Sequence, residues 1–268
     1  MISIKRNYLY NCFQVIVNIF FPVITIFYIS RIFGPSILGR VNFAISLVSF
    51  LSLIASLAIP LYGSREIARV RDNPNELNKK YTELFIINFT SSFFFLFIYS
   101  TLFLFSVKMR EEWLLFTVTG MLLVFNSMWV DWLFQGLENY KSIAFRNIVV
   151  KIISLCTIFI LVRKQDDYIF YAALNTLSIG IYNILGLIEA KKVVYLKCSG
   201  IQIKSHFRSM LLILGIAAGS SICTYSDIIM LGMMSDDKSV GLYSAAIRIP
   251  RIVTMLVTSL STVLIPRS

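Results

Sequence analysis

Long apolar runs alternate with short polar segments along the whole of this sequence. Each run approaches the roughly 20 residues that an α-helix needs to cross the hydrocarbon core of a bilayer. The pattern therefore predicts an all-α membrane protein, a polytopic bundle of about eight transmembrane helices. The longest segment between spans contains RDNPNELNKK at residues 71–80, whose Pro and Asn residues predict a turn between two helical stretches. The predicted spans are residues 8–29, 41–59, 84–107, 113–134, 143–162, 168–188, 210–234 and 240–265.

The composition indicates that lipid is the main solvent of this chain. Hydrophobic residues make up 57% of it, charged residues only 15%, and the mean hydropathy is +0.76. A soluble domain is typically about 25% charged. In a soluble protein the net charge of +11 would suggest nucleic acid. Here basic loops that fix the topology explain the charge better, and they would also attract anionic lipid headgroups, so no nucleic-acid partner is predicted.

The distribution of Lys and Arg between the spans predicts the orientation. With the N-terminus in the cytoplasm, the inner segments hold 15 of these residues, the outer segments hold 7, and three lie inside spans. Such an excess is the usual signature of the inner side of a membrane protein. The count assigns Arg146 to an inner segment and Arg31 to an outer one. The sequence therefore predicts a multi-pass protein of the cytoplasmic membrane with a cytoplasmic N-terminus.

A weak internal repeat relates the beginning of the chain to its end. A shift of 202 residues places GRVNFA, residues 39–44, on GLYSAA, residues 241–246, and each segment follows an apolar run and a polar turn. Transporters built from repeated helix bundles often retain such symmetry. We therefore expect an N-terminal six-helix lobe at residues 1–209. Residues 210–268 would supply the first two helices of an incomplete second lobe, as in a truncated product.

Charged residues inside the predicted spans are the main candidates for function. A charge at the centre of a transmembrane helix costs about 2.5–3.5 kcal/mol on insertion scales, so such residues usually face a cavity or one another. Five residues fit this description: Asp131, Lys151, Asp227, Arg248 and Arg251.

Two of these candidates have competing interpretations. Lys151 lies nine residues into its span among uncharged neighbours, which favours a polar cavity. Alternatively, the span begins near residue 152 and Lys151 lies at the inner interface. Asp131 follows Trp129 and precedes Trp132, so it is either a functional carboxylate or an interfacial one at a helix end.

Asp227 and Arg248 lie at similar distances from the polar turn SDDKS at residues 235–239. Two antiparallel helices would place them at about the same depth, so we expect them to face each other within the bundle. Arg251 follows one turn later on a similar face. A purely structural ion pair is the alternative, since buried pairs often serve neither stability nor catalysis.

No enzyme signature is present in the sequence. GPSILGR, residues 34–40, has the glycine spacing of a phosphate-binding loop, but it lacks the Lys-Ser/Thr that should follow. The single histidine, His206, falls in a predicted inner basic loop, and the four cysteines lack zinc-site spacing. The sequence thus predicts a protein that is not an enzyme, with no catalytic residues, no cofactor and no metal.

Several segments together resemble a known family. They read FPVITIFYISRIFGPSILGRVNFAISLVSF, IPLYGSREIARVRD, DWLFQGLENY, KIISL and SDIIMLGMMSDDKSVGLYSAAIRI, and they cover nearly the whole chain in the family's order. The chain resembles the polysaccharide flippases of the Wzx/RfbX type, which handle O-antigen or capsule repeat units and belong to the MATE-like exporter superfamily.

The resemblance implies twelve or more helices in two six-helix lobes, of which this chain would supply the first lobe and the opening hairpin of the second. It implies a bacterial inner-membrane transporter that flips an undecaprenyl-diphosphate-linked oligosaccharide by alternating access. Its partners would be this lipid-linked substrate, membrane lipids and polysaccharide polymerase machinery. A cationic cavity would hold the diphosphate. The transport-site candidates are Arg31, Lys151, Arg248 and Arg251, with the acidic residues Asp131 and Asp227.

Two other functions remain open from the sequence. A cation-coupled multidrug exporter of the same superfamily would favour an acidic cavity, whereas here the intramembrane bases outnumber the acids by three to two. A membrane enzyme of polysaccharide assembly would carry a large outer loop or an intramembrane histidine, and the sequence predicts neither.

Overall fold

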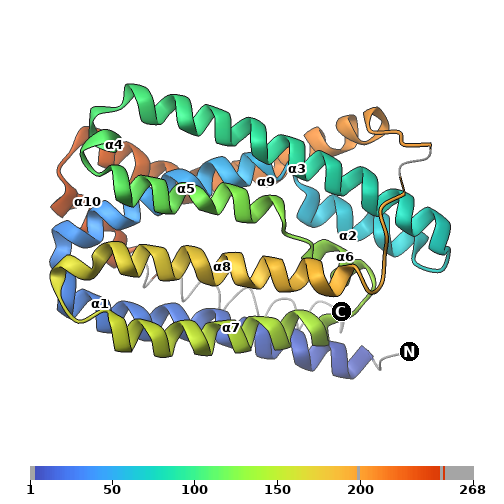
Figure 1. Cartoon of the computed structure of the whole chain (residues 1–268), viewed down its shortest axis with the longest axis horizontal. Coiled ribbons are helices and arrows are strands. Elements are labelled where there is room, and N and C mark those ends of the chain that lie inside the picture. Colours follow the sequence, from blue (N-terminus) through green and yellow to red (C-terminus); the bar gives the residue numbers. More distant parts are fainter. Residues whose placement is uncertain (1–3, 198–199, 248–249, 251–268) are drawn as a thin grey trace.

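The computed structural model describes residues 4–197, 200–247 and 250. Helices account for all the regular structure of this part of the chain, which contains no strand (Figure 1). The predicted all-α class is therefore confirmed. The helices are α1 (Ile4–Ala55), α2 (Ile59–Val70), α3 (Pro74–Phe105), α4 (Val107–Glu111), α5 (Trp113–Ser127), α6 (Asp131–Gly136), α7 (Tyr140–Leu161), the 3-10 helix η1 (Gln165–Asp167), α8 (Tyr168–Ala190), α9 (Lys204–Met234) and α10 (Asp237–Ala246).

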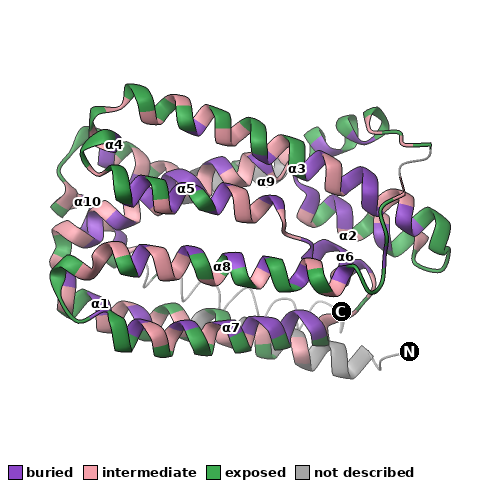
Figure 2. Cartoon of the chain, viewed as in Figure 1, coloured by how far each residue is buried: buried purple, intermediate pink, exposed green. Residues whose placement is uncertain are grey.

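The helical bundle has the length and surface of a membrane domain. Five helical runs among the described residues are long and apolar enough to cross a bilayer: Ile16–Val70, Pro74–Phe105, Trp113–Gly136, Tyr140–Leu161 and Gln165–Ala190. Many large apolar side chains are exposed, and exposed positions recur along the long helices (Figure 2). These features confirm a polytopic membrane protein. The total of eight spans stays a prediction because most of the eighth lies outside the described residues.

The first helical run turns back on itself at Gly34. This residue has φ 68° and ψ 175°, a conformation that glycine adopts readily because it has no Cβ, and Pro35 follows it. The N-terminus and α2 lie at one end of the bundle, and the turn lies at the other (Figure 1). The two halves of α1 are therefore antiparallel, and they correspond to the first two predicted spans.

The connections gather at two opposite ends of the bundle. We call the end with the N-terminus, α2 and α6 the inner end, and the end with the Gly34 turn, α4 and the α9–α10 connection the outer end (Figure 1). The names follow the predicted orientation, which stays a prediction. The predicted turn within residues 71–80 is confirmed, because Asn73 precedes α3 and its side chain accepts hydrogen bonds from the backbone of Asn75 and Glu76.

The predicted span at residues 113–134 is not one continuous helix. Helix α5 ends at Ser127, and α6 begins at Asp131 after a short break. The break places the Asp131 carboxylate in the first turn of a helix, where the helix dipole favours a negative charge. Sequence periodicity alone missed it because the run remains apolar on both sides.

The contacts between α1 and α10 follow the 202-residue shift seen in the sequence. A Cβ atom at Gly39 would lie 1.7 Å from the Asp237 carbonyl oxygen, and one at Gly241 would lie 1.8 Å from the Pro35 carbonyl oxygen. Asn42 donates a hydrogen bond of 2.9 Å to Ser244, the residue 202 positions later. Reciprocal contacts of this kind are those of a two-fold interface, here between two segments of one chain.

The buried apolar core forms two clusters. One lies toward the outer end and includes Phe33, Val41 and Phe116, and the other lies toward the inner end and includes Trp132 and Leu133. Polar side chains of several helices also come together inside the bundle, and these side chains form the candidate site.

Candidate functional site

A polar cavity of about 280 Å³ lies among α1, α6, α7 and α8. Three of these helices each contribute two polar residues four positions apart, which places both on one helix face. Asp131, at the start of α6, also lines the cavity. The structure thus brings together Asp131 and Lys151, two residues that the sequence had singled out separately. The pairs are Gln14 and Asn18 on α1, Asn147 and Lys151 on α7, and Ser178 and Tyr182 on α8.

Asp131 is held in a buried ion-pair network. Its side chain lies 3.1 Å from Arg146 Nη2 and accepts a hydrogen bond from the Tyr182 hydroxyl. Arg146 Nε in turn lies 3.3 Å from Glu189, and the guanidinium lies 4.7 Å from the centre of the Phe134 ring. Asp131 is only 6% exposed, so it lies inside the bundle rather than at its surface. Its functional role stays a prediction.

Arg146, assigned from the sequence to an inner segment, is buried within the bundle, and the side of the membrane on which it lies stays a prediction. The residue lies in α7 and is 6% exposed, and its charge is compensated by carboxylates from two other helices. Gly186 of α8 makes room for it, since a Cβ there would lie 2.1 Å from Arg146 Nη1. This nitrogen is buried and has no hydrogen-bond partner within the described structure. Sequence reasoning missed the site because the compensating residues come from other helices.

Lys151 lies on the cavity wall. Its ammonium group donates a hydrogen bond to the Asn18 side chain of α1 and lies 5.4 Å from the centre of the Phe21 ring. In this position it adds a positive charge to a cavity whose nearby carboxylates are already paired with Arg146.

A second cavity of about 390 Å³ adjoins the first and shares Ile179 and Tyr182 with it. Among the described residues, its lining has hydroxyl, amide and aromatic groups and no charged side chain. Two buried polar atoms in this lining, Ser52 Oγ and Asn183 Oδ1, have no hydrogen-bond partner within the described part of the chain. Buried polar groups are normally satisfied, so these two atoms are exceptions within this lining. The polar and aromatic lining residues are Ser49, Ser52, Ser56, Asn88, Ser92, Asn126, Trp129, Tyr182, Asn183 and Tyr225.

No charged residue of the sequence pointed to this second cavity. A weaker signal was available in the spacing of Ser49, Ser52 and Ser56, which recur on one helix face of an otherwise apolar run.

The other predicted site residues lie elsewhere. Arg31 is exposed on α1 and lines neither of the two cavities. Asp227 is exposed on α9 and accepts a hydrogen bond of 2.9 Å from the Tyr243 hydroxyl. Arg248 and Arg251 lie outside the described residues, and so does the predicted pairing of Asp227 with Arg248.

An ion-pair network joins α1, the α4–α5 region and α10 at the outer end. Arg40 lies 2.6 Å from Glu112 and 3.0 Å from Asp237, and Lys108 lies 2.8 Å from Asp237. The adjacent Asp236 caps α10, and hydrogen bonds from the Ser239 side chain and backbone lower the pKa of its carboxyl group below the usual range. The network ties the start of α10 to the first half of the chain.

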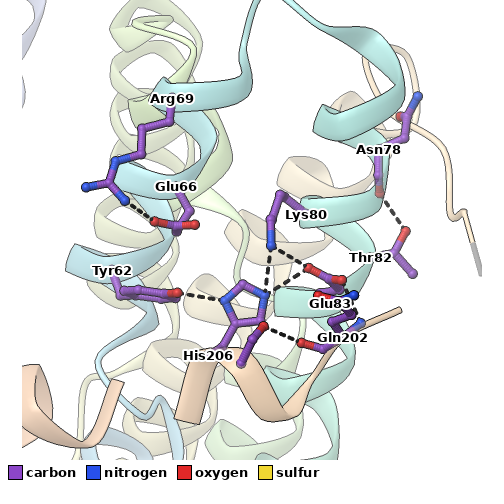
Figure 3. A network of polar contacts seen from close by, with 10 residues as sticks. Tyr62, Glu66, Arg69, Asn78, Lys80, Thr82, Glu83, Gln202 and His206 are labelled. Carbon is purple, nitrogen blue, oxygen red and sulfur yellow. Dashed lines mark hydrogen bonds and ion pairs between the residues drawn. The ribbon is translucent and has the colours of Figure 1, made fainter. Parts of the chain in front are cut away.

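A second network lies at the inner end and centres on His206 (Figure 3). His206 Nε2 lies 2.8 Å from Glu83, His206 Nδ1 lies 2.7 Å from the Tyr62 hydroxyl, and Lys80 lies 3.0 Å from Glu83. The prediction that His206 falls in a loop is wrong, because it lies in the first turn of α9 and is 1% exposed. Its partners come from α2 and α3, which the sequence could not place beside it.

Comparison with known proteins assigns the family. Residues 4–268 match the sequence model of the family described as polysaccharide biosynthesis protein. The chain belongs to this polysaccharide biosynthesis family. A relative from Shigella dysenteriae, named "Putative O-antigen transporter", is 28% identical over 235 residues, which cover 85% of this chain and 58% of the relative. A relative of the same name from Escherichia coli K12 is 23% identical over 272 residues, which cover 99% of this chain and 65% of the relative.

Membership of the polysaccharide biosynthesis family confirms the resemblance predicted from the sequence segments. The chain is thus a multi-pass bacterial membrane protein of this family, and it spans about three fifths of the length of the curated relatives that it matches. No solved structure matches the chain.

Proposed function

We propose that this chain forms part of a flippase that moves an undecaprenyl-diphosphate-linked oligosaccharide across the bacterial inner membrane. The observation that carries the proposal is the pair of adjoining polar cavities within membrane-length helices whose outer faces are apolar. Oligosaccharide hydroxyls and phosphate charges lose their hydration when they enter a bilayer, at a large cost in free energy. Polar cavities at that depth can replace the lost hydration, while the lipid tail stays in the bilayer.

The two cavities suit the two polar parts of such a cargo. In the first cavity, Lys151 offers a positive charge to the diphosphate, and Arg146 lies behind Asp131. The second cavity offers hydroxyl and amide groups together with Trp129 and Tyr225, and these neutral donors, acceptors and aromatic faces suit sugar rings. Arg31, Asp227, Arg248 and Arg251 remain candidates for contact with the cargo at other stages of transport.

The outer network supports transport by alternating access. In such a cycle, a central site opens to one side of the membrane while the other side is closed. Here Arg40, Glu112 and Asp237 link the first half of the chain to the α9–α10 hairpin at the outer end. This arrangement fits a state that is closed to the outside, with a cytoplasmic N-terminus and with residues 1–209 and 210–268 contributing to separate lobes. Polysaccharide polymerase machinery would receive the cargo at the outer leaflet.

The position of Lys151 on the wall of the first cavity favours an anionic cargo over a cationic drug. Asp131 faces Arg146 and accepts a hydrogen bond from Tyr182, and Arg146 is shared with Glu189, which does not line the cavity. A multidrug exporter for cations would need a free carboxylate at this place. The family and the cavity also support a transporter rather than an enzyme of polysaccharide assembly.

Binding measurements on the purified chain in lipid nanodiscs test this proposal. We expect a fluorescent undecaprenyl-diphosphate oligosaccharide to bind, and Lys151→Gln to weaken binding by about tenfold through the loss of one charge-assisted contact. Lys141→Gln is the matched control, because Lys141 is exposed on the same helix and lines neither cavity. Binding of a cationic dye at the same cavity, with no binding of the oligosaccharide, would contradict the proposal.

A further inference from the structure

A third polar cavity lies at the inner end, apart from the two central cavities. It has a volume of about 410 Å³ and lies between α2 and α9, beside the beginning of α3. Arg65 and Arg69 line it from α2, and Ser205 and Ser209 line it from α9. Each pair is four residues apart, so each lies on one face of its helix. Two guanidinium groups thus share a cavity with two hydroxyl groups from a helix distant in the sequence.

The floor of this cavity is held in place by buried hydrogen bonds. His206 and Lys80 both line it, and both contact Glu83, which is fully buried (Figure 3). Glu83 also accepts a hydrogen bond of 2.8 Å from the backbone of Gln202, just before α9. The start of α9 is therefore fixed against α2 and α3 before any ligand arrives, and a site organised in advance loses less entropy on binding.

The charges of the cavity are not balanced. Arg69 is paired with Glu66 at 2.8 Å, and Lys80 is paired with Glu83 at 3.0 Å. Arg65 is exposed and has no ion-pair partner among the described residues. Within the described part of the chain, the lining thus has three cationic side chains and one acidic residue, Glu66. Arginine suits phosphate oxygens in particular, because its planar donors form paired hydrogen bonds.

Helix α2 lies at the end of the bundle, where a membrane surface would be. Ile59 and Ile67 are buried against the bundle, whereas Arg65 and Arg69 are exposed on the other side of the helix. An amphipathic helix of this kind places its basic residues at the level of lipid headgroups. We propose that this inner cavity binds a phosphate group, supplied by the headgroup of an anionic membrane lipid. This site does not depend on transport by the central cavities.

The proposal can be tested on the full chain in nanodiscs of phosphatidylcholine, titrated with fluorescent phosphatidylglycerol. The test variant is Arg65→Gln with Arg69→Gln. Its matched control is Lys204→Gln with Arg208→Gln, which removes the same charge from exposed residues of α9 that do not line the cavity. We expect the test pair to weaken binding by at least about tenfold and the control pair by less than about twofold. Ser209→Leu, which fills the cavity without changing the charge, should weaken binding as well.

Competition by inorganic pyrophosphate identifies the source of the phosphate group. Displacement of the lipid by pyrophosphate would support a site that recognises the phosphate alone. Lipid binding that is lost in the test pair but resists pyrophosphate would support a site that needs a lipid headgroup. If the test and control pairs weaken lipid binding equally, the effect comes from general surface charge, and the proposal is overturned. Unchanged lipid binding in the test pair would overturn it as well.

Discussion

At the scale of single residues, the ion pairs beside the first cavity show how charges inside the bundle are compensated. Asp131, Arg146 and Glu189 come from three different helices and form a charge network beside the first cavity, in which Asp131 and Arg146 are buried and Glu189 is half-buried. Removing one partner from such a network leaves an uncompensated charge, which typically costs about 3–5 kcal/mol. The network therefore fixes the relative positions of α6, α7 and α8 around the cavity.

Gly186→Ala tests how closely Arg146 is held. The added methyl group would lie 2.1 Å from Arg146 Nη1, so the guanidinium would have to move away from its carboxylates. We expect a loss of about 1–3 kcal/mol of stability from this overpacking, seen as a lower midpoint of thermal unfolding in detergent. Gly215→Ala is the control, because a Cβ there meets nothing within 4 Å and alanine is the better helix former. An unchanged midpoint for Gly186→Ala would show that Arg146 is not confined by α8.

At the scale of helices, the backbones of α1 and α10 come close together where the two helices cross. Gly39 and Gly241 each contact a carbonyl oxygen of the other segment, and the contacts obey the same 202-residue shift as the sequence repeat. A side chain at either position would separate the helices. The shared shift supports a common origin for the two hairpins.

A disulfide can test this crossing. Asn42 Nδ2 lies 2.9 Å from Ser244 Oγ, so cysteines at both positions should lie within reach of a disulfide bond. The test uses a chain whose four natural cysteines are replaced by serine. In this background we expect Asn42→Cys with Ser244→Cys to form a disulfide under mild oxidation. The disulfide is detected as a shift in gel mobility after proteolysis between the two sites. Asn42→Cys with Leu242→Cys should not, because Leu242 is 56% exposed and lies on a different face of α10. Equal cross-linking of both pairs would contradict the crossing.

Hydropathy predicted most of the helices but not the details that form the site. The apolar runs predicted the two antiparallel halves of α1 and the helices α3, α7 and α8, because each of these is a continuous apolar segment long enough to cross a membrane. The break before Asp131 and the burial of Arg146 and His206 depend on side chains that reach them from other helices. From the sequence alone, a polar residue near the end of an apolar run is easily assigned to a loop. The partners that allow Arg146 and His206 to be buried come from other helices, so the sequence does not identify them.

At the scale of the whole molecule, the connections at each end of the bundle should lie on one side of the membrane. The excess of Lys and Arg places the inner end in the cytoplasm, and this excess remains after Arg146 is removed from the count. We expect reporter fusions after Lys79 and after Lys192 to report a cytoplasmic location, and a fusion after Arg110 to report the outside. An outside signal after Lys192 would show that the orientation or the number of spans is wrong.

The central claim, that the two adjoining cavities hold a lipid-linked oligosaccharide, can be tested most directly by photo-cross-linking. An undecaprenyl-diphosphate oligosaccharide with a diazirine on its terminal sugar would be irradiated with the chain in nanodiscs, and the labelled residues identified by mass spectrometry. We predict labels on Trp129, Tyr182 and Tyr225, which line the second cavity, and weaker labelling in Lys151→Gln. Labels confined to outward-facing residues such as Phe94 and Phe97, unchanged in Lys151→Gln, would contradict the account.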